Sequence, residues 1–388
     1  MTVAVGLTAY WLWQALDFTV NNKTVANIDT MQFPIGQVHF PAVTACSFNL
    51  VSRRAALRLL GNWTFPRNIS KDQVFEEMRL LPIAMFRGRS AFLAPNALKT
   101  TLFLNKVSIE TLMKELAVPC DELIVRCAWQ DKTQDCRKMF RMVKTFEGYC
   151  CAFNYIGDHN SSFEETENGP HPLEKSVATT GSDDGLVILV RTDKNDYHAT
   201  MFSSYGTKLL ISRPRSYISE TARLVVVAPS TLIMVSYTPA LTTTSAEVKA
   251  LDTSLRDCVI ENEVSLAYFK LYTYHNCLEE CKINITERYC GCVLTTYYTT
   301  NMDRVCDLND LPCLASHQAL INSYMLSDEF THVDVQQLRT KWPTPCALIN
   351  SYMLSDEFTH VDVQQLRTKW PTPCGCKPRC YYTQYSLQ

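Results

Sequence analysis

The hydrophobic pattern of the chain changes from helical to strand-like near its middle. Ser70 and Gln73 have the spacing of a capping box, and they predict a helix that runs to about Leu81. A second helix is predicted before Cys120, where apolar residues recur at steps of three and four. These apolar residues are Val107, Ile109, Leu112, Met113 and Leu116.

Short apolar runs predict strands in the following part of the chain. The runs occupy residues 186–190, 208–212, 223–227 and 231–235, and each is expected to be a buried strand. The polar residues 157–184, rich in Asn, Ser, Glu, Gly and Asp, are expected to form a surface loop. Strands with helices on both sides predict an α+β fold.

Cysteines dominate the last third of the chain. Cys277 and Cys281 lie in a segment with a helical pattern, residues 265–281, where four residues advance about 6 Å and return to the same face. Cys374 and Cys376 are two apart, and in a strand they would advance about 6.6 Å on one face. Matching pitch allows a ladder with rungs Cys277–Cys376 and Cys281–Cys374. Cys258 and Cys380 would close the same hairpin, and the cysteines between residues 290 and 313 would close its tip.

Cysteine usage and glycosylation sequons both indicate an extracellular protein. Seventeen cysteines in 388 residues are many for a reducing cytosol. Zinc binding is the alternative, although the paired Cys-x2-Cys spacing of structural zinc sites does not occur. The Asn-x-Ser/Thr sequons, which require exposed loops, are at Asn22, Asn62, Asn68, Asn160 and Asn284.

Length and charge exclude some classes of function. A chain of 388 residues can bury a large core, and a net charge of −2 without a basic patch makes nucleic acid an improbable partner. Residues 1–18 are apolar and aromatic, with Tyr10, Trp11 and Trp13 suited to a membrane interface. We interpret them as the outer part of an incomplete transmembrane helix, with residues 19–388 extracellular. A buried N-terminal strand or helix is the alternative.

Four motifs in order carry a family resemblance. They are Phe40-Pro-Ala-Val-Thr-Ala-Cys46-Ser-Phe-Asn49, then Gly148-Tyr-Cys150-Cys151-Ala-Phe-Asn154, then Arg256-Asp-Cys258-Val-Ile-Glu-Asn-Glu263, then Cys374-Gly-Cys376-Lys-Pro-Arg-Cys380. Together they resemble the epithelial sodium channel/degenerin family. The doubled cysteine and the extra Cys120 are similar to the arthropod pickpocket branch.

The resemblance implies a subunit of an amiloride-sensitive, sodium-selective channel of the plasma membrane, gated by a ligand, acid or mechanical force. It implies a homo- or hetero-trimer of related subunits, with no cofactor. The implied fold is a disulfide-rich ectodomain with a β palm and knuckle and helical finger and thumb. Finger helices are expected at about 50–150, palm and knuckle strands at about 185–245, and the thumb and cysteine-rich stalk at 250–388.

The resemblance also implies disulfide partners for sixteen cysteines. The implied pairs are Cys46–Cys150, Cys120–Cys151, Cys127–Cys136, Cys258–Cys380, Cys277–Cys376, Cys281–Cys374, Cys290–Cys313 and Cys292–Cys306. Cys120 and Cys151 are paired by exclusion, and Cys346 is left as a free thiol.

An exact tandem repeat explains the extra cysteine. Residues 319–346 recur without a change as residues 347–374. Repeat proteins vary between copies and need about three units for stability, so two identical copies indicate a recent duplication or an assembly error. Deleting one copy is expected to leave the fold intact.

The chain ends at Gln388, before any segment that resembles the family's pore helix, so a truncated channel subunit is the expected interpretation. A non-conducting ectodomain, anchored or secreted, that binds subunits or ligands is the alternative. An enzyme is disfavoured because the sequence has no Gly-x-Ser-x-Gly and no His-Glu-x-x-His.

Carboxylates near the expected thumb helix are candidate gating groups. Glu261 and Glu263 are two apart, and paired carboxylates can share a proton at a raised pKa. Glu279 and Glu280 lie in the helical segment and are expected, first, to be a solvated helix face. Tyr268, Tyr272 and Tyr274 are expected to pack between thumb and palm.

Overall fold

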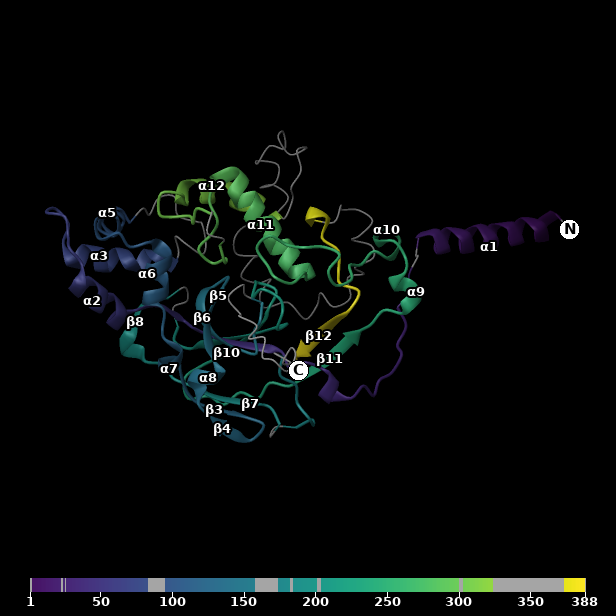
Figure 1. Ribbon diagram of the computed structural model, residues 1–388, viewed down its shortest axis with the longest axis horizontal. Coiled ribbons are helices and arrows are strands. Elements are labelled where there is room, and N and C mark those ends of the chain that lie inside the picture. The colour runs from purple at the N-terminus through teal and green to yellow at the C-terminus, as the bar shows by residue number, and fades with distance from the viewer. Residues whose placement is uncertain are drawn as a thin grey trace, which may run out of the picture.

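A five-stranded antiparallel sheet lies at the centre of the computed structural model (Figure 1). The structure describes residues 2–21, 24, 26–82, 95–157, 174–181, 184–200, 204–299, 303–323 and 373–387. The strands are, in spatial order, β10 (Arg223–Val227), β9 (Thr207–Ser212), β1 (Ala42–Ser47), β6 (Gly148–Phe153) and β5 (Arg141–Thr145). Val43 of the central β1 lies opposite Ile211 of β9 and Phe153 of β6. The two faces of β1 lie in different apolar clusters, so its side chains from Ala42 to Cys46 are buried without alternation.

Apolar clusters cover the two faces of this sheet. On one face Phe40 packs edge-on against Trp129, with ring centroids 4.8 Å apart, and Phe153 lies beside both. Trp129 ends β3 (Ile124–Trp129), the middle strand of a second sheet with β4 (Lys132–Gln134) and β7 (Leu186–Val190). The other face is covered by a cluster that includes Val143, Leu210 and Ile218. The predicted α+β class therefore agrees with the mixed helix and sheet structure.

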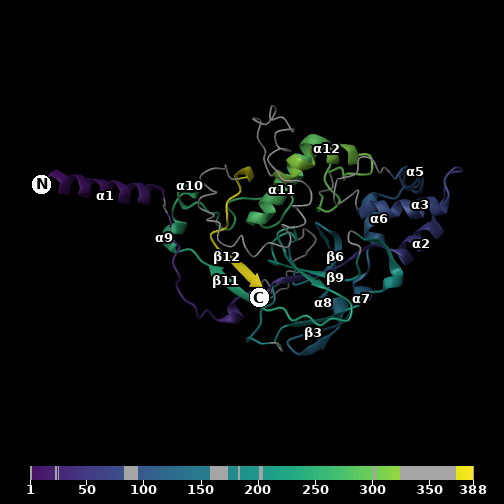
Figure 2. The ribbon, with the colours of Figure 1, turned by 180° about the vertical axis from the view of Figure 1, so that it is seen from behind.

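Helices α2 (Arg53–Asn62), α3 (Lys71–Glu77), α5 (Asn96–Asn105) and α6 (Ile109–Leu116) gather at one end of the molecule (Figures 1 and 2). Ser70 caps α3 by accepting a hydrogen bond from the Gln73 N–H, as the capping pattern predicts, and a 3-10 turn continues it to Leu80. Ser108 caps α6 in the same way. Both predicted helices are confirmed.

The remaining elements are short or lie in the last third of the chain. Asn49–Ser52 (β2) pairs with Tyr197–Thr200 (β8), and Tyr237–Thr242 (β11) pairs with Tyr382–Leu387 (β12). The other helices are α7 (Cys120–Leu123), α8 (Cys136–Met139), α9 (Ala246–Lys249), α10 (Thr253–Arg256), α11 (Tyr274–Cys290) and α12 (Leu311–Ser323).

The four strand predictions have mixed outcomes. Residues 208–212 form the buried β9, whereas 186–190 and 223–227 form β7 and β10, whose side chains are partly or mostly exposed. Both exposed strands are at the edge of their sheets, where each pairs with one described strand only. The prediction for 231–235 is wrong: no strand forms there, and Leu232 is 88% exposed. Ser230, with a φ of +62°, turns the chain just before this segment.

The N-terminal helix α1 (Thr2–Asn21) projects away from the rest of the molecule (Figures 1 and 2). Its described side chains, Val5 to Phe18 among them, are exposed, so the alternative of a buried N-terminal element is wrong. Within the described ranges, none of the helices combines the length and apolar character that a membrane span requires. The expected surface loop at 157–184 lies largely outside the described residues, but Glu174 and Val177 within it are buried.

Candidate functional site: a disulfide-braced helix and the carboxylates beside it

Helix α11 is joined to the C-terminal segment by two rungs of a disulfide ladder. Cys277 bonds to Cys376, and Cys281, one turn later, bonds to Cys374. The helix begins at Tyr274 rather than near residue 265, because Thr273 has extended dihedral angles and its side chain caps the Asn276 N–H. The expected strand at 374–376 is also wrong, since Cys374 has a φ of +55° in a 3-10 turn.

The described disulfides are eight, and they join the same cysteines, pair for pair, as the family resemblance implies. In the last third these are Cys258–Cys380, Cys277–Cys376, Cys281–Cys374, Cys290–Cys313 and Cys292–Cys306. In the first half they are Cys46–Cys150, Cys120–Cys151 and Cys127–Cys136. Cys346 lies outside the described residues.

The doubled cysteine on β6 places one disulfide on each face of the central sheet. Successive residues of a strand point to opposite faces, so Cys150 and Cys151 lie in different apolar clusters. Cys150 bonds to Cys46 of the neighbouring β1, and Cys151 bonds to Cys120 at the start of α7. The doublet therefore links the sheet both internally and to the helices beside it.

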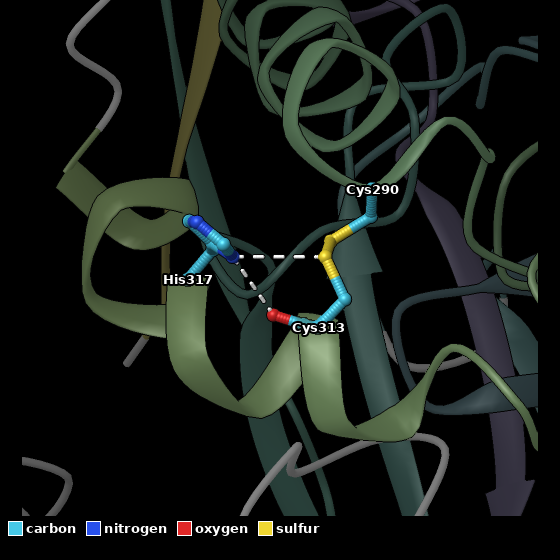
Figure 3. Close-up of side chains that lie close together, drawn as sticks. All are labelled: Cys290, Cys313 and His317. Carbon is cyan, nitrogen blue, oxygen red and sulfur yellow. Dashed lines mark hydrogen bonds between the residues drawn. A yellow bond between two sulfur atoms is a disulfide. The ribbon is translucent and has the colours of Figure 1, made fainter.

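Side chains with metal-ligand character meet at the tip of α11, yet their sulfur atoms are bonded to each other. Figure 3 shows His317 of α12 beside the Cys290–Cys313 disulfide. Its Nδ1 is 3.6 Å from the Cys313 Sγ and 3.0 Å from the Cys313 carbonyl oxygen. A zinc site of this kind requires thiolates, whereas these sulfurs form a disulfide.

Three of the sequon asparagines are described, and all three are exposed. Asn62 ends α2, Asn68 lies in the turn before α3, and Asn284 is on the outer face of α11. Asn22 and Asn160 lie outside the described residues. Glycosylation at these positions stays a prediction.

The candidate gating carboxylates each lie next to arginine. Glu263 pairs with the Arg256 guanidinium and accepts a hydrogen bond from the Ile260 N–H at 2.8 Å. Its pKa is lowered, first by the Arg256 hydrogen bond and then by the Ile260 N–H, which is opposite to the shift that proton sharing requires. Glu261 points elsewhere, with its carboxylate 3.7 Å from Arg215 and 3.9 Å from Arg379.

Glu279 is a buried acid rather than part of a solvated helix face. It is 2% exposed, accepts a hydrogen bond from the Tyr297 hydroxyl at 2.6 Å, and lies 3.6 Å from the Lys282 ammonium. Burial raises its pKa, while Lys282 and Tyr297 oppose that shift. Glu280 is partly buried and accepts a hydrogen bond from the Tyr268 N–H. The expectation of a solvated pair is therefore wrong.

Asn276, which sequence reasoning did not single out, anchors α11 to the segment that follows β9. Its side-chain oxygen accepts the Tyr217 N–H at 2.7 Å, and its amide donates to the Arg215 and Leu271 carbonyls. The residue is fully buried, so loss of these bonds would leave several backbone groups unsatisfied. No clear sequence signal marks it, because α11 also buries the polar residues Glu279, Lys282 and Thr286.

Tyrosines complete the contact between α11 and its surroundings. Tyr268 lies in the cluster with Tyr217 and Ile283, and the Tyr272 hydroxyl donates to the Lys377 carbonyl at 2.7 Å. Tyr272 therefore links the chain just before α11 to the C-terminal segment by a hydrogen bond. The third expected tyrosine, Tyr274, makes an edge contact with His275 instead.

The sequence profile of the family described as "Amiloride-sensitive sodium channel" matches residues 1–388. The chain belongs to this family. Members are ion channels rather than enzymes, which is the class expected from the sequence.

Relatives among characterised proteins agree with the pickpocket resemblance. The chain is 28% identical over 312 residues to sodium channel protein Nach of Drosophila ananassae, covering 79% of this chain and 58% of that protein. It is 27% identical to the Drosophila melanogaster Nach protein, covering 83% of this chain and 63% of the relative. Pickpocket protein 28 of Drosophila melanogaster is 26% identical over 55% of this chain and 40% of its own length. The chain thus spans about three fifths of the two Nach proteins.

Proposed function

We propose that this chain is the extracellular part of a sodium channel subunit of the plasma membrane. The observation that carries the proposal is the family match over all 388 residues. The braced architecture supports it, because a channel ectodomain must pass motion through rigid parts. The complete subunit would conduct sodium, show block by amiloride, and assemble as a homo- or hetero-trimer with related subunits.

The regions of the structure then take the names of the family's domains. The central sheet and the β11–β12 pair would be the palm and knuckle, and α2, α3, α5 and α6 the finger. Helices α11 and α12 with the five surrounding disulfides would be the thumb and stalk. Residues 1–18 would be the outer part of the first transmembrane helix.

Within this proposal α11 transmits movement of the outer domain to the membrane segments. Asn276 and Tyr297 join it to the body of the molecule, since Tyr297 bonds Glu279 and its carbonyl accepts from Lys144 of β5 at 2.8 Å. The disulfide ladder joins the same helix to the segment that leads into β12. Mild reduction of surface disulfides is expected to alter gating, and unchanged currents would count against this role.

Voltage-clamp recording of oocytes that express the full transcript tests the function. A sodium-dependent current that amiloride blocks, alone or with a related subunit, is the expected result. Surface protein that neither carries nor modifies a current with any related subunit would reject the channel proposal. It would instead favour the non-conducting, ligand- or partner-binding ectodomain.

A further inference from the structure

A cavity of about 440 Å³ lies where the start of α11 meets the segments that follow β9 and that form β12. Its lining comes from residues 213–216, 273–275, 378–379 and 381–385, together with His39, Glu174 and Glu261. Cavities of this size hold small organic ligands. The chemistry of the lining therefore indicates what kind of ligand would fit.

Three arginines line the cavity, and one of them is fully paired. Arg215 contacts the carboxylate of Glu174, which is 7% exposed and whose other oxygen lies 3.1 Å from the His39 Nδ1. Glu174 is thus already committed to two partners on its own side of the cavity. The positive charges of the other two arginines therefore need a different anion.

Arg213 and Arg379 are less closely paired. Arg213 donates its Nε–H to the Thr383 carbonyl, and the carboxylate nearest to Arg379 is that of Glu261, at 3.9 Å. In the part of the chain that the structure describes, neither arginine has a carboxylate within hydrogen-bond distance. Burial lowers the pKa of both guanidinium groups, which reflects the cost of holding an incompletely paired cation away from water.

The rest of the lining adds aromatic surface and little opposing charge. Tyr274, Tyr381 and Tyr382 contribute their rings, and the Arg213 guanidinium lies 5.5 Å from the centre of the Tyr382 ring. Burial and the neighbouring Arg213 lower the pKa of His275 to about 4, so its ring is neutral at pH 7. The lining therefore presents three guanidinium groups against the two carboxylates of Glu174 and Glu261.

We propose that this cavity binds a small organic carboxylate, with its anionic group between Arg213 and Arg379 and its apolar body against the tyrosines. A planar carboxylate matches the forked donors of a guanidinium, and binding would supply a hydrogen-bonded carboxylate to both arginines. The inference concerns a binding site and holds whether or not the parent protein conducts ions.

Calorimetric titration of the purified chain with sodium benzoate, at constant ionic strength, tests the site. Benzoate is expected to bind once per chain, and Arg379→Gln is expected to weaken binding by roughly tenfold or more. Arg379→Lys keeps the positive charge and loses the forked pair of donors. Its affinity for benzoate is expected to lie between those of the wild type and Arg379→Gln. Arg137→Gln, an exposed arginine on α8 with the same charge change, is expected to bind like the wild type.

The neutral isostere benzamide and inorganic phosphate are the matched probes. Neither is expected to bind with the affinity of benzoate. Absence of saturable benzoate binding, or equal binding by Arg379→Gln, would overturn the proposal. Equally tight binding of phosphate would also overturn it, since the site would then select a simple anion. Arg213→Gln serves as a second variant if Arg379→Gln fails to fold, with the same loss expected.

Discussion

Two helical regions of this molecule are held in place by different means. Helices α2, α3, α5 and α6 share a core of sixteen buried residues among those described, and none of the sixteen is a cysteine. Helices α11 and α12 share a described cluster of six, of which three are disulfide-bonded cysteines, Cys281, Cys292 and Cys306. A large apolar core stabilises a region by burial alone, whereas a small one needs covalent links.

The difference also fits the proposed roles of the two regions. Disulfides fix α11 to the C-terminal segment at defined points, so a displacement of the helix moves that segment with it. A purely apolar contact permits more sliding. The comparison predicts that the two regions respond in opposite ways to reduction and to core truncation.

Removal of every link to the C-terminal segment is expected to have the largest effect. Replacement by Ser of the six cysteines in Cys258–Cys380, Cys277–Cys376 and Cys281–Cys374 frees that segment, and the loop-entropy estimate for a separation of 93 residues is about 4–5 kcal/mol of unfolding free energy. The matched control, Cys127→Ser with Cys136→Ser, opens a link across 9 residues and is expected to cost about 2–3 kcal/mol. Urea titration of both secreted variants measures the difference, and equal losses would contradict the comparison.

Truncation of the apolar core is expected to rank second. Leu112→Ala removes a fully buried side chain from the α2–α6 core, at a cost of about 2–4 kcal/mol. Leu57→Ala is the control, because the Leu57 side chain on α2 is 44% exposed. It should change the unfolding free energy by less than about 0.5 kcal/mol. Under reducing conditions the cost of Leu112→Ala should persist, and its disappearance would show that this core also depends on disulfides.

The pH dependence of stability is expected to differ between the two helical regions because of the buried Glu279 in α11. Its pKa is higher in the folded protein than in the unfolded chain, so its contribution is present below the unfolded pKa. That contribution is lost as the pH rises through the folded pKa. Glu279→Gln is therefore expected to flatten the fall in stability with rising pH, whereas Glu115→Gln, exposed on α6, is expected to keep the wild-type slope. Thermal unfolding across pH 4 to 8 measures both, and identical slopes would refute the assignment.

Loss of a helix cap in the apolar region should have a smaller effect. Ser70→Ala removes the hydrogen bond to the Gln73 N–H at the start of α3, at a cost of about 1 kcal/mol. Thr100→Ala on the exposed face of α5 is the control, with a change below about 0.5 kcal/mol. Chemical denaturation resolves the two, and an unchanged Ser70→Ala variant would argue against the cap.

Deletion of one repeat copy should have the smallest effect of all. Removing residues 319–346 or 347–374 yields the same polypeptide, because the copies are identical. The cysteine before Gly375 is kept in either case, so the ladder can still form. Secretion and the unfolding midpoint are expected to match the full chain, and misfolding of the deletion protein would show that the repeat is structural.

The sequence predicted much of this architecture where the signal is local. The Ser70 cap, the apolar spacing of α6 and the run that forms β9 depend on neighbours within a few residues. The helical half of the pitch argument also holds, since Cys277 and Cys281 lie one turn apart on α11, whereas the strand that it assumed at Cys374 and Cys376 does not form.

Several of the failures are tertiary. Nothing in residues 231–235 reveals that no described strand lies beside them, and nothing in Glu279 reveals the Tyr297 hydroxyl that meets it. The separation of Glu261 from Glu263 depends on where Arg215 and Arg256 lie after folding. The arginine cavity joins residues about 170 positions apart, as the bond from Arg213 to Thr383 shows, so no local pattern marks it.

Disulfide mapping of the full, non-reduced chain by mass spectrometry tests the central claim most directly. The account predicts peptides that link Cys277 to Cys376 and Cys281 to Cys374, with Cys346 as the free thiol. Linkage of Cys281 to Cys346, or of Cys277 and Cys281 to the tip cysteines, would contradict the ladder and with it the braced helix.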